Sequence, residues 1–159
     1  MSVLSELAPN LEARECEYLT GIIRSWDLLA DLSFADLLLC IPDDQSPITS
    51  YTIVAHVRPT TSRSIYRTEM EGRRFTEGER PFLDQARQNS AMVDGGLILQ
   101  TPVERIRTLS VPVVFEGKVL AVLSRDFSPD DQRVAGELEM TYFSLFRRLA
   151  LMITQDCYP

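Results

Sequence analysis

The one histidine of the chain, His56, is the first residue to consider for chemistry, because an imidazole can accept a phosphoryl group, move a proton or bind a metal ion. It lies in the β-branched run 51–57, which predicts a strand. A phosphoacceptor histidine lies on a helix, so this placement argues against that role. We interpret His56 as an ordinary strand histidine, with the lining of a ligand pocket as the functional alternative.

Arg58 follows the same run and has two interpretations. Its guanidinium is suited to bind a carboxylate or phosphate through two parallel hydrogen bonds. It is equally suited to pair with Asp31 or Asp36 and fix the end of the strand, and we favour this structural pairing. Arg125 and Asp126 present the same alternatives, and there we expect adjacent opposite charges to stabilise a turn at a strand end.

The three cysteines, Cys16, Cys40 and Cys157, are odd in number and widely spaced, so they predict no disulfide framework and no zinc site. Cys40 lies in an apolar run and is expected to be inert core. Cys16 stands between two glutamates, whose charges discourage a thiolate. The sequence contains no GxGxxG, Walker A, HExxH or nucleophile-elbow motif, so we predict no catalytic residue and no metal, and any cofactor is unknown.

Composition restricts the class of protein. The chain has 159 residues, 45% of them hydrophobic, which suffices for one domain with its own core. The formal net charge of -7 argues against binding to nucleic acid or to an anionic membrane surface. No apolar run approaches the roughly 20 residues that span a bilayer, and the N-terminus lacks a secretory signal. We expect a cytoplasmic protein.

The hydrophobic pattern predicts an α+β fold with a mainly antiparallel sheet. The turn 116–118 contains Gly117 and is typical of a tight hairpin. The expected elements are a helix over 11–30 with Asn10 as N-cap, strands over 34–41 and 51–57, an extended piece around 64–67, a helix over 79–88, a turn at 94–96, strands over 106–115 and 118–124, and a final helix that 128–131 begins and 137–153 continues.

Both outer helices carry apolar stripes at steps of three and four residues. Either the stripes cover the sheet, or part of them forms the seam of a parallel dimer; both can hold at once. The first stripe consists of Leu19, Ile22, Ile23, Trp26 and Leu29. The second has heptad spacing and consists of Leu138, Tyr142, Leu145, Leu149 and Met152, with Phe143, Phe146 and Ile153 broadening it.

Several segments, in the right order, resemble the amino-terminal GAF-like domain of actinobacterial cytosolic sensor histidine kinases of the PdtaS type. They are 29–39 (LADLSFADLLL), 54–59 (VAHVRP), 111–113 (VPV) with 119–126 (VLAVLSRD), and 138–142 (LEMTY). The resemblance covers nearly the whole chain and is weak between about 67 and 100. It implies a GAF fold: a central, mainly antiparallel sheet of five or six strands, with the N- and C-terminal helices on one face and a ligand cavity on the other.

The resemblance also implies a function. Residues 1–159 would form one non-catalytic sensory domain of a two-component histidine kinase, followed by PAS and kinase domains and served by a cognate response regulator. We predict ligand contacts at Asp36, His56, Arg58 and Tyr66, and a homodimer. The ligand, a small molecule or a redox cue, is not identified. The alternatives are a ligand-free dimerisation and interdomain module and, third, a cysteine-dependent GAF enzyme.

Overall fold

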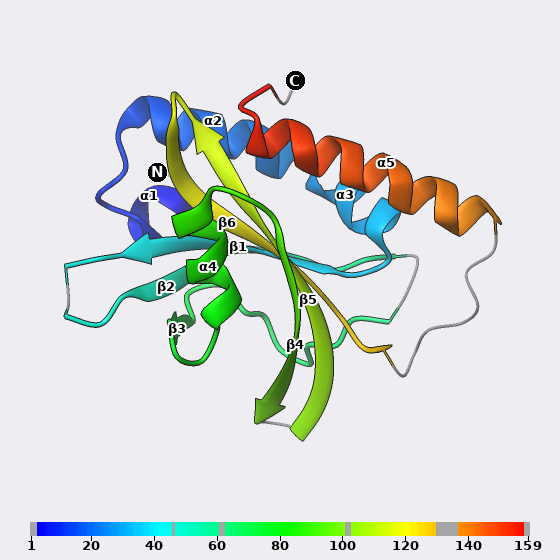
Figure 1. Ribbon diagram of the computed structural model, residues 1–159. Coiled ribbons are helices and arrows are strands. Elements are labelled where there is room, and N and C mark those ends of the chain that lie inside the picture. The colour runs from blue at the N-terminus through cyan, green and yellow to red at the C-terminus, as the bar shows by residue number, and fades with distance from the viewer. Residues whose placement is uncertain (1–2, 46, 61–62, 101–102, 130–136, 158–159) are drawn as a thin grey trace.

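The computed structural model describes residues 3–45, 47–60, 63–100, 103–129 and 137–157 (Figure 1). Its elements, in chain order, are α1 (Val3–Leu7), α2 (Ala13–Arg24), α3 (Trp26–Ser33), β1 (Asp36–Asp43), β2 (Ser50–Val57), β3 (Arg74–Thr76), α4 (Pro81–Asn89), β4 (Val93–Gln100), β5 (Val103–Phe115), β6 (Lys118–Phe127) and α5 (Glu137–Thr154). None of the helices in these ranges is long and apolar enough to cross a membrane.

The strands form one antiparallel sheet in the order β3-β2-β1-β6-β5-β4. The predicted late hairpin is confirmed as β5 and β6, which are joined through Glu116 and Gly117. Both turn residues have positive φ, 50° and 77°, as a two-residue hairpin turn requires. The predicted α+β fold class is therefore confirmed, with six strands.

Side chains of the sheet alternate between two apolar cores. On one face, here called the helix face, α1, α2, α3 and α5 pack against Leu37, Leu39, Val111 and Leu123. On the other, here called the α4 face, α4 and the 58–80 segment pack against the opposite set of strand residues. In Figure 1, α2, α3 and α5 lie together along one side of the sheet, and both marked chain ends lie there too.

A β-bulge decides which face His56 occupies. The β1–β2 register pairs Cys40 with Ile53 and Leu39 with Ala55, so Val54 is an extra residue in β2. Because strand side chains alternate, one extra residue reverses the faces of all that follow. The bulge therefore puts His56 on the α4 face, the face of Tyr51 and Ile53.

Three local predictions were wrong. The helix over 11–30 is two helices, α2 and α3, which divide at Ser25, and its N-cap is Glu12 rather than Asn10. Glu12 and Glu15 form a reciprocal capping box, in which the Glu15 carboxylate accepts from the Glu12 N–H at 2.9 Å. The first strand begins at Asp36 and continues through Pro42, which is tolerated because β6 pairs with β1 only as far as Cys40.

The middle of the chain also differs from expectation. The predicted turn at 94–96 is wrong, since these residues lie inside β4, where the ring of Phe82 packs directly on Gly95 and a Cβ would come within 2.3 Å of the ring. No strand forms at 64–67, whereas the short β3 was not predicted. The predicted helix over 79–88 is confirmed as α4, with Pro81 in its first turn. The predicted helix start at 128–131 falls partly outside the described residues.

Candidate functional site

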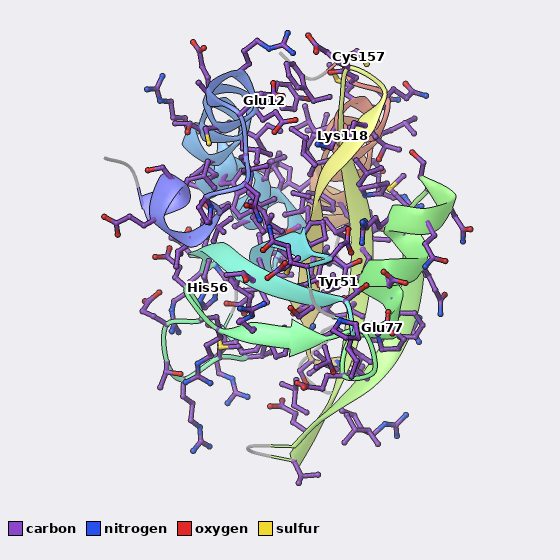
Figure 2. The ribbon with its side chains drawn as sticks, turned by 90° about the vertical axis from the view of Figure 1, so that its left-hand side faces the viewer. Glu12, Tyr51, His56, Glu77, Lys118 and Cys157 are labelled. Atoms are coloured by element: carbon purple, nitrogen blue, oxygen red, sulfur yellow. The ribbon has the colours of Figure 1, made fainter. Side chains whose placement is uncertain are left out.

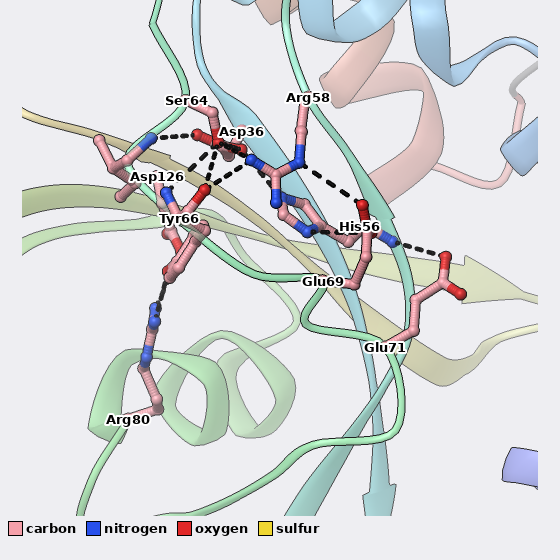
Figure 3. A network of polar contacts seen from close by, with 10 residues as sticks. Asp36, His56, Arg58, Ser64, Tyr66, Glu69, Glu71, Arg80 and Asp126 are labelled. Carbon is pink, nitrogen blue, oxygen red and sulfur yellow. Dashed lines mark hydrogen bonds and ion pairs between the residues drawn. The ribbon is translucent and has the colours of Figure 1, made fainter. Parts of the chain in front are cut away.

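Two aspartates lie opposite each other at one end of the α4 face. Asp36 of β1 and Asp126 of β6 are register partners, and both are fully buried. Two carboxylates at such close range repel each other and lose hydration, so each needs its own hydrogen-bond donors. The surrounding polar residues provide them, largely from β2 and from the 58–80 segment, which ends at Arg80 directly before α4 (Figure 3).

Asp36 holds the chain that follows β2. Its Oδ1 lies 2.8 Å from His56 Nε2 and accepts from the Ser64 hydroxyl at 2.6 Å, while Oδ2 accepts from the Ile65 N–H at 2.9 Å. The other ring nitrogen, His56 Nδ1, is buried without a hydrogen-bond partner among the described residues, and the Glu69 carboxylate lies 3.8 Å from it. Asp36 and His56 therefore connect β1, β2 and the loop that follows β2. These two residues are here called the latch.

Arg58 serves the same loop, but not by the predicted pairing with Asp31 or Asp36. Its Nη1 donates to the Tyr66 carbonyl at 2.6 Å and to the Ser64 hydroxyl at 3.2 Å, and its Nε lies 3.7 Å from Glu69. A segment without secondary structure leaves carbonyl oxygens unpaired, and the N–H groups of a guanidinium can donate to them. The predicted pairing is therefore wrong, since Arg58 holds the loop after β2 through other partners, and its contact with a ligand stays a prediction.

Asp126 is the centre of a second cluster. Its Oδ2 accepts from the Tyr66 hydroxyl at 2.5 Å and from Arg80 Nη1 at 3.0 Å, while Oδ1 accepts from Ser124 at 2.7 Å. Arg80 also donates to the Tyr66 hydroxyl at 2.6 Å. Burial alone would raise the pKa of Asp126, but Arg80 and the hydroxyl donors outweigh it and hold that pKa below its usual range. The carboxylate is therefore charged, and it binds α4 to the sheet.

Arg125 points to the opposite face of the sheet from Asp126. It donates twice to the carbonyl of Ser33, at 3.1 and 2.6 Å, and its guanidinium lies 4.3 Å from the ring centre of Phe127 and 4.6 Å from that of Phe143. The expected turn-stabilising pair of Arg125 and Asp126 is wrong, since neighbouring strand residues face opposite ways. Burial lowers the pKa of Arg125 to about 10.

Side chains fill the α4 face where a ligand cavity was expected. Apart from the polar clusters, this core consists of Leu38, Cys40, Tyr51, Ile53, Ile65, Tyr66, Met70, Leu83, Ala86, Ile106 and Val122. A narrow gap remains beneath the start of α4, next to Arg80, and it has no room for a water molecule. At this gap, the described side chains of the α4 face leave no open cavity.

The four predicted ligand contacts, Asp36, His56, Arg58 and Tyr66, do lie together in one network. No bound molecule tests the prediction that they touch a ligand. The sequence analysis missed Arg80, although a buried arginine directly before a helix-starting proline is the link between α4 and Asp126. Its position in the most polar stretch of the chain gave no sign of burial.

The predicted helix stripe divides between several environments. Leu149 packs on the core, Tyr142 stacks on Phe34 with ring centres 6.2 Å apart, and Leu145 is 42% exposed. Met152 is half-buried, and the side chain of Leu138 lies outside the described residues. The residues of α5 that are buried against the sheet are Phe146, Ala150 and Ile153.

The three cysteines are free, and none forms a disulfide. Cys40 is buried on β1, Cys16 is half-buried on α2, and Cys157 is exposed beyond α5. Figure 2 shows Cys157 near Lys118, at the end of the molecule that carries the β5–β6 turn. Burial, the largest effect on the Cys40 thiol, raises its pKa to about 12. The prediction that Cys40 is core is confirmed.

Comparison with known proteins agrees with the predicted fold. The profile of the family described as "Histidine kinase PdtaS, GAF domain" matches residues 1–145. The sensor histidine kinase PdtaS of Mycolicibacterium smegmatis is 26% identical over 168 aligned residues, which cover 100% of this chain and 32% of that protein. The chain therefore spans about a third of this relative's length.

Solved structures show the same fold. The sensor region of a sensor histidine kinase superposes with a TM-score of 0.80 at 26% identity, covering 100% of this chain and 55% of that one. The second GAF domain of DevS from Mycobacterium smegmatis superposes with a TM-score of 0.51 at 16% identity, covering 84% of this chain and 94% of that one. This second likeness concerns the fold alone.

We predict that Arg80→Met lowers the free energy of unfolding at pH 7 by about 3–5 kcal/mol, because it leaves Asp126 charged and buried without its cation. The pKa of Asp126 is lowered in the folded protein, so the pair stabilises above pH ~4, the unfolded value, and this contribution is lost as the pH falls through the folded value. The difference in the free energy of unfolding between the variant and the wild type, measured by urea titration, should therefore become smaller below pH ~4.

Arg74→Met is the matched control. The ion pair of Arg74 with Asp43 spans 2.8 Å but is exposed, so its loss should cost less than about 1 kcal/mol at any pH. Equal deficits for the two variants would contradict the central role of Arg80.

We also predict that iodoacetamide at neutral pH modifies Cys157 in the folded protein and leaves Cys40 unmodified, because the Cys40 thiol is buried and its pKa is raised. Peptide mapping by mass spectrometry reads out each site. Unfolding in urea should expose all three thiols and serves as the control. Modification of native Cys40 as fast as that of Cys157 would show that the α4 face opens readily.

Proposed function

We propose that this chain, which belongs to the family of histidine kinase PdtaS GAF domains, is the non-catalytic regulatory input domain of a cytoplasmic two-component sensor histidine kinase. Residues 1–159 would form its single GAF domain. PAS and kinase domains would follow, and a cognate response regulator would receive the phosphoryl group. In this scheme His56 is a structural residue of the latch, because its ring is buried against Asp36, and the phosphoacceptor histidine belongs to the kinase part.

The observation that carries the proposal is the position of Arg125 and Asp126, adjacent in β6 but on opposite faces of the sheet. Asp126 is held by Tyr66 and Arg80 on the α4 face. Arg125 is held by the end of α3 and by Phe143 of α5 on the helix face. A shift of this strand end thus changes contacts on both faces together.

Signalling through this strand end requires two packings of similar free energy, one of which a cue favours. A cue on the α4 face that alters the hold of Arg80 on Asp126 would displace β6 locally. Arg125 would then move relative to α3 and α5, since its two hydrogen bonds and its ring contacts leave it little freedom. The outer helices would carry the change toward the kinase.

A second candidate function, a ligand-free dimerisation and interdomain module, is favoured by the closed α4 face. Both functions use the outer helices, where large apolar side chains remain exposed. Leu28 of α3 is 58% exposed and Leu145 of α5 is 42% exposed, and these two helices pack against each other. Exposed apolar side chains on adjacent helices favour a homodimer seam at this surface.

For the seam, we predict a dimer in light scattering that Leu145→Glu converts to a monomer without unfolding it, because Leu145 lies outside the core. Ile98→Glu is the matched control: Ile98 is 60% exposed on β4, away from the outer helices, so this variant should remain dimeric. A folded wild-type monomer at high concentration would rule out the seam.

For the coupling, we predict that Arg125→Met in the full-length kinase changes the autophosphorylation rate at least severalfold, because the variant loses both contacts to the Ser33 carbonyl. Arg107→Met is the control, since Arg107 is an exposed arginine of β5 whose partner is Asp94 at 3.0 Å. Kinase rates measured with purified proteins should stay unchanged for Arg107→Met. Equal effects, or none, would contradict the route through β6.

A further inference from the structure

We propose that the gap beneath α4 is a closed binding site for a small neutral carbonyl compound, which would bind between Arg80 and Ser110 after Phe82 swings outward. This inference rests on the proposed sensory function, because it names the chemical class of the cue. The gap is lined by Arg80, Phe82, Leu83, Leu97, Thr108, Ser110 and Ser124.

Ser110 supplies the first unmet hydrogen-bonding group. Ser110 is 1% exposed and lines the gap, and its hydroxyl has no hydrogen-bond partner among the described residues. The neighbouring hydroxyls are already engaged: Thr108 and Ser124 lie 2.9 Å apart, and Ser124 donates to Asp126. A buried hydroxyl without a partner is uncommon, and this one lines a gap that a ligand group could enter.

Arg80 supplies further donors. A guanidinium carries five N–H groups, and the hydrogen bonds to Asp126 and to the Tyr66 hydroxyl engage Nη1 and Nη2 once each. An acceptor oxygen in the gap can thus take an N–H from Arg80 and the O–H of Ser110. A carbonyl oxygen, with two lone pairs, accepts both.

Charge balance decides that the ligand is neutral. Asp126 already neutralises Arg80, and Asp36 lies opposite Asp126 in the register. A ligand carboxylate would add another negative charge to this buried group, and an ammonium would meet the guanidinium; neither arrangement is favourable away from water. The apolar remainder of the ligand would contact Leu83 and Leu97.

Phe82 is suited to be the gate. Its ring is half-buried and lies over Gly95 of the edge strand β4, where a larger residue would displace it. Rotation of one half-buried side chain opens the gap without breaking the bond between Arg80 and Asp126. A ligand ring can then occupy the space that the Phe82 ring leaves, so phenyl ketones are suitable probes.

The test is a titration followed by ¹H–¹⁵N NMR on the 159-residue chain with three probes of matched shape: acetophenone, α-methylstyrene, which lacks the acceptor oxygen, and benzoate, which adds charge. Acetophenone should shift the amides of Leu83 and Ser110 saturably. Phe82→Ala should bind it at least tenfold more tightly, because the gate is removed.

Ser110→Ala, introduced into Phe82→Ala, should weaken acetophenone binding at least fivefold and leave α-methylstyrene unaffected. This difference separates a hydrogen bond from a general effect on the fold. Phe115→Ala is the matched control, because it removes a ring that stacks on Tyr18 on the other side of the sheet and should give no gain at the Ser110 amide.

Three results would overturn the inference. α-Methylstyrene could bind as tightly as acetophenone, which would reduce the site to an apolar hole. Benzoate could bind more tightly than acetophenone, which would refute the charge argument. Folded Phe82→Ala could show no saturable shift with any probe. None of these readouts involves kinase activity, so failure here is distinguishable from failure of the coupling through Arg125.

Discussion

The structure depends on one electrostatic constraint: two buried aspartates face each other across the central strands β1 and β6. Buried carboxylates need hydrogen-bond donors, and β6 itself supplies one, the Ser124 hydroxyl. The other donors come from His56 on β2 and from the 58–80 segment, which ends at Arg80 directly before α4. Meeting this requirement orders the loop and attaches α4, so the polar clusters, as much as the apolar core, close this face.

Strand alternation then connects this constraint to the outer helices. Asp126 and its neighbour Arg125 cannot point the same way, so the residue that meets the α4 face fixes the residue that meets α3 and α5. Arg125 is a costly choice at a largely apolar interface, since burial lowers its pKa to about 10 and no carboxylate within the described residues pairs with it. A leucine would pack there at lower cost, and this difference favours a role in positioning.

Sequence patterns could predict those elements whose side chains have a clear period. The late hairpin, α4 and the buried stripe of α2 and α3 followed from apolar spacing and from turn residues. The site could not be predicted as fully, because Arg80 and Asp126 are 46 residues apart and meet only through the sheet order. The bulge at Val54 and the contact of Phe82 on Gly95 are likewise properties of packing, with no signal in one sequence.

A closed α4 face is compatible with sensing. If the competent, open conformation is a minor state, the apparent affinity for a cue falls by the fraction of molecules that are open. A small open fraction also means that few molecules adopt the open packing when no cue is bound. A face that was always open would have no second packing for a cue to favour. The buried pair of Asp126 and Arg80 affects this balance, because an opening that separates the two breaks their ion pair. A gate at Phe82 avoids that cost, and the ion pair can stay intact while the gap fills.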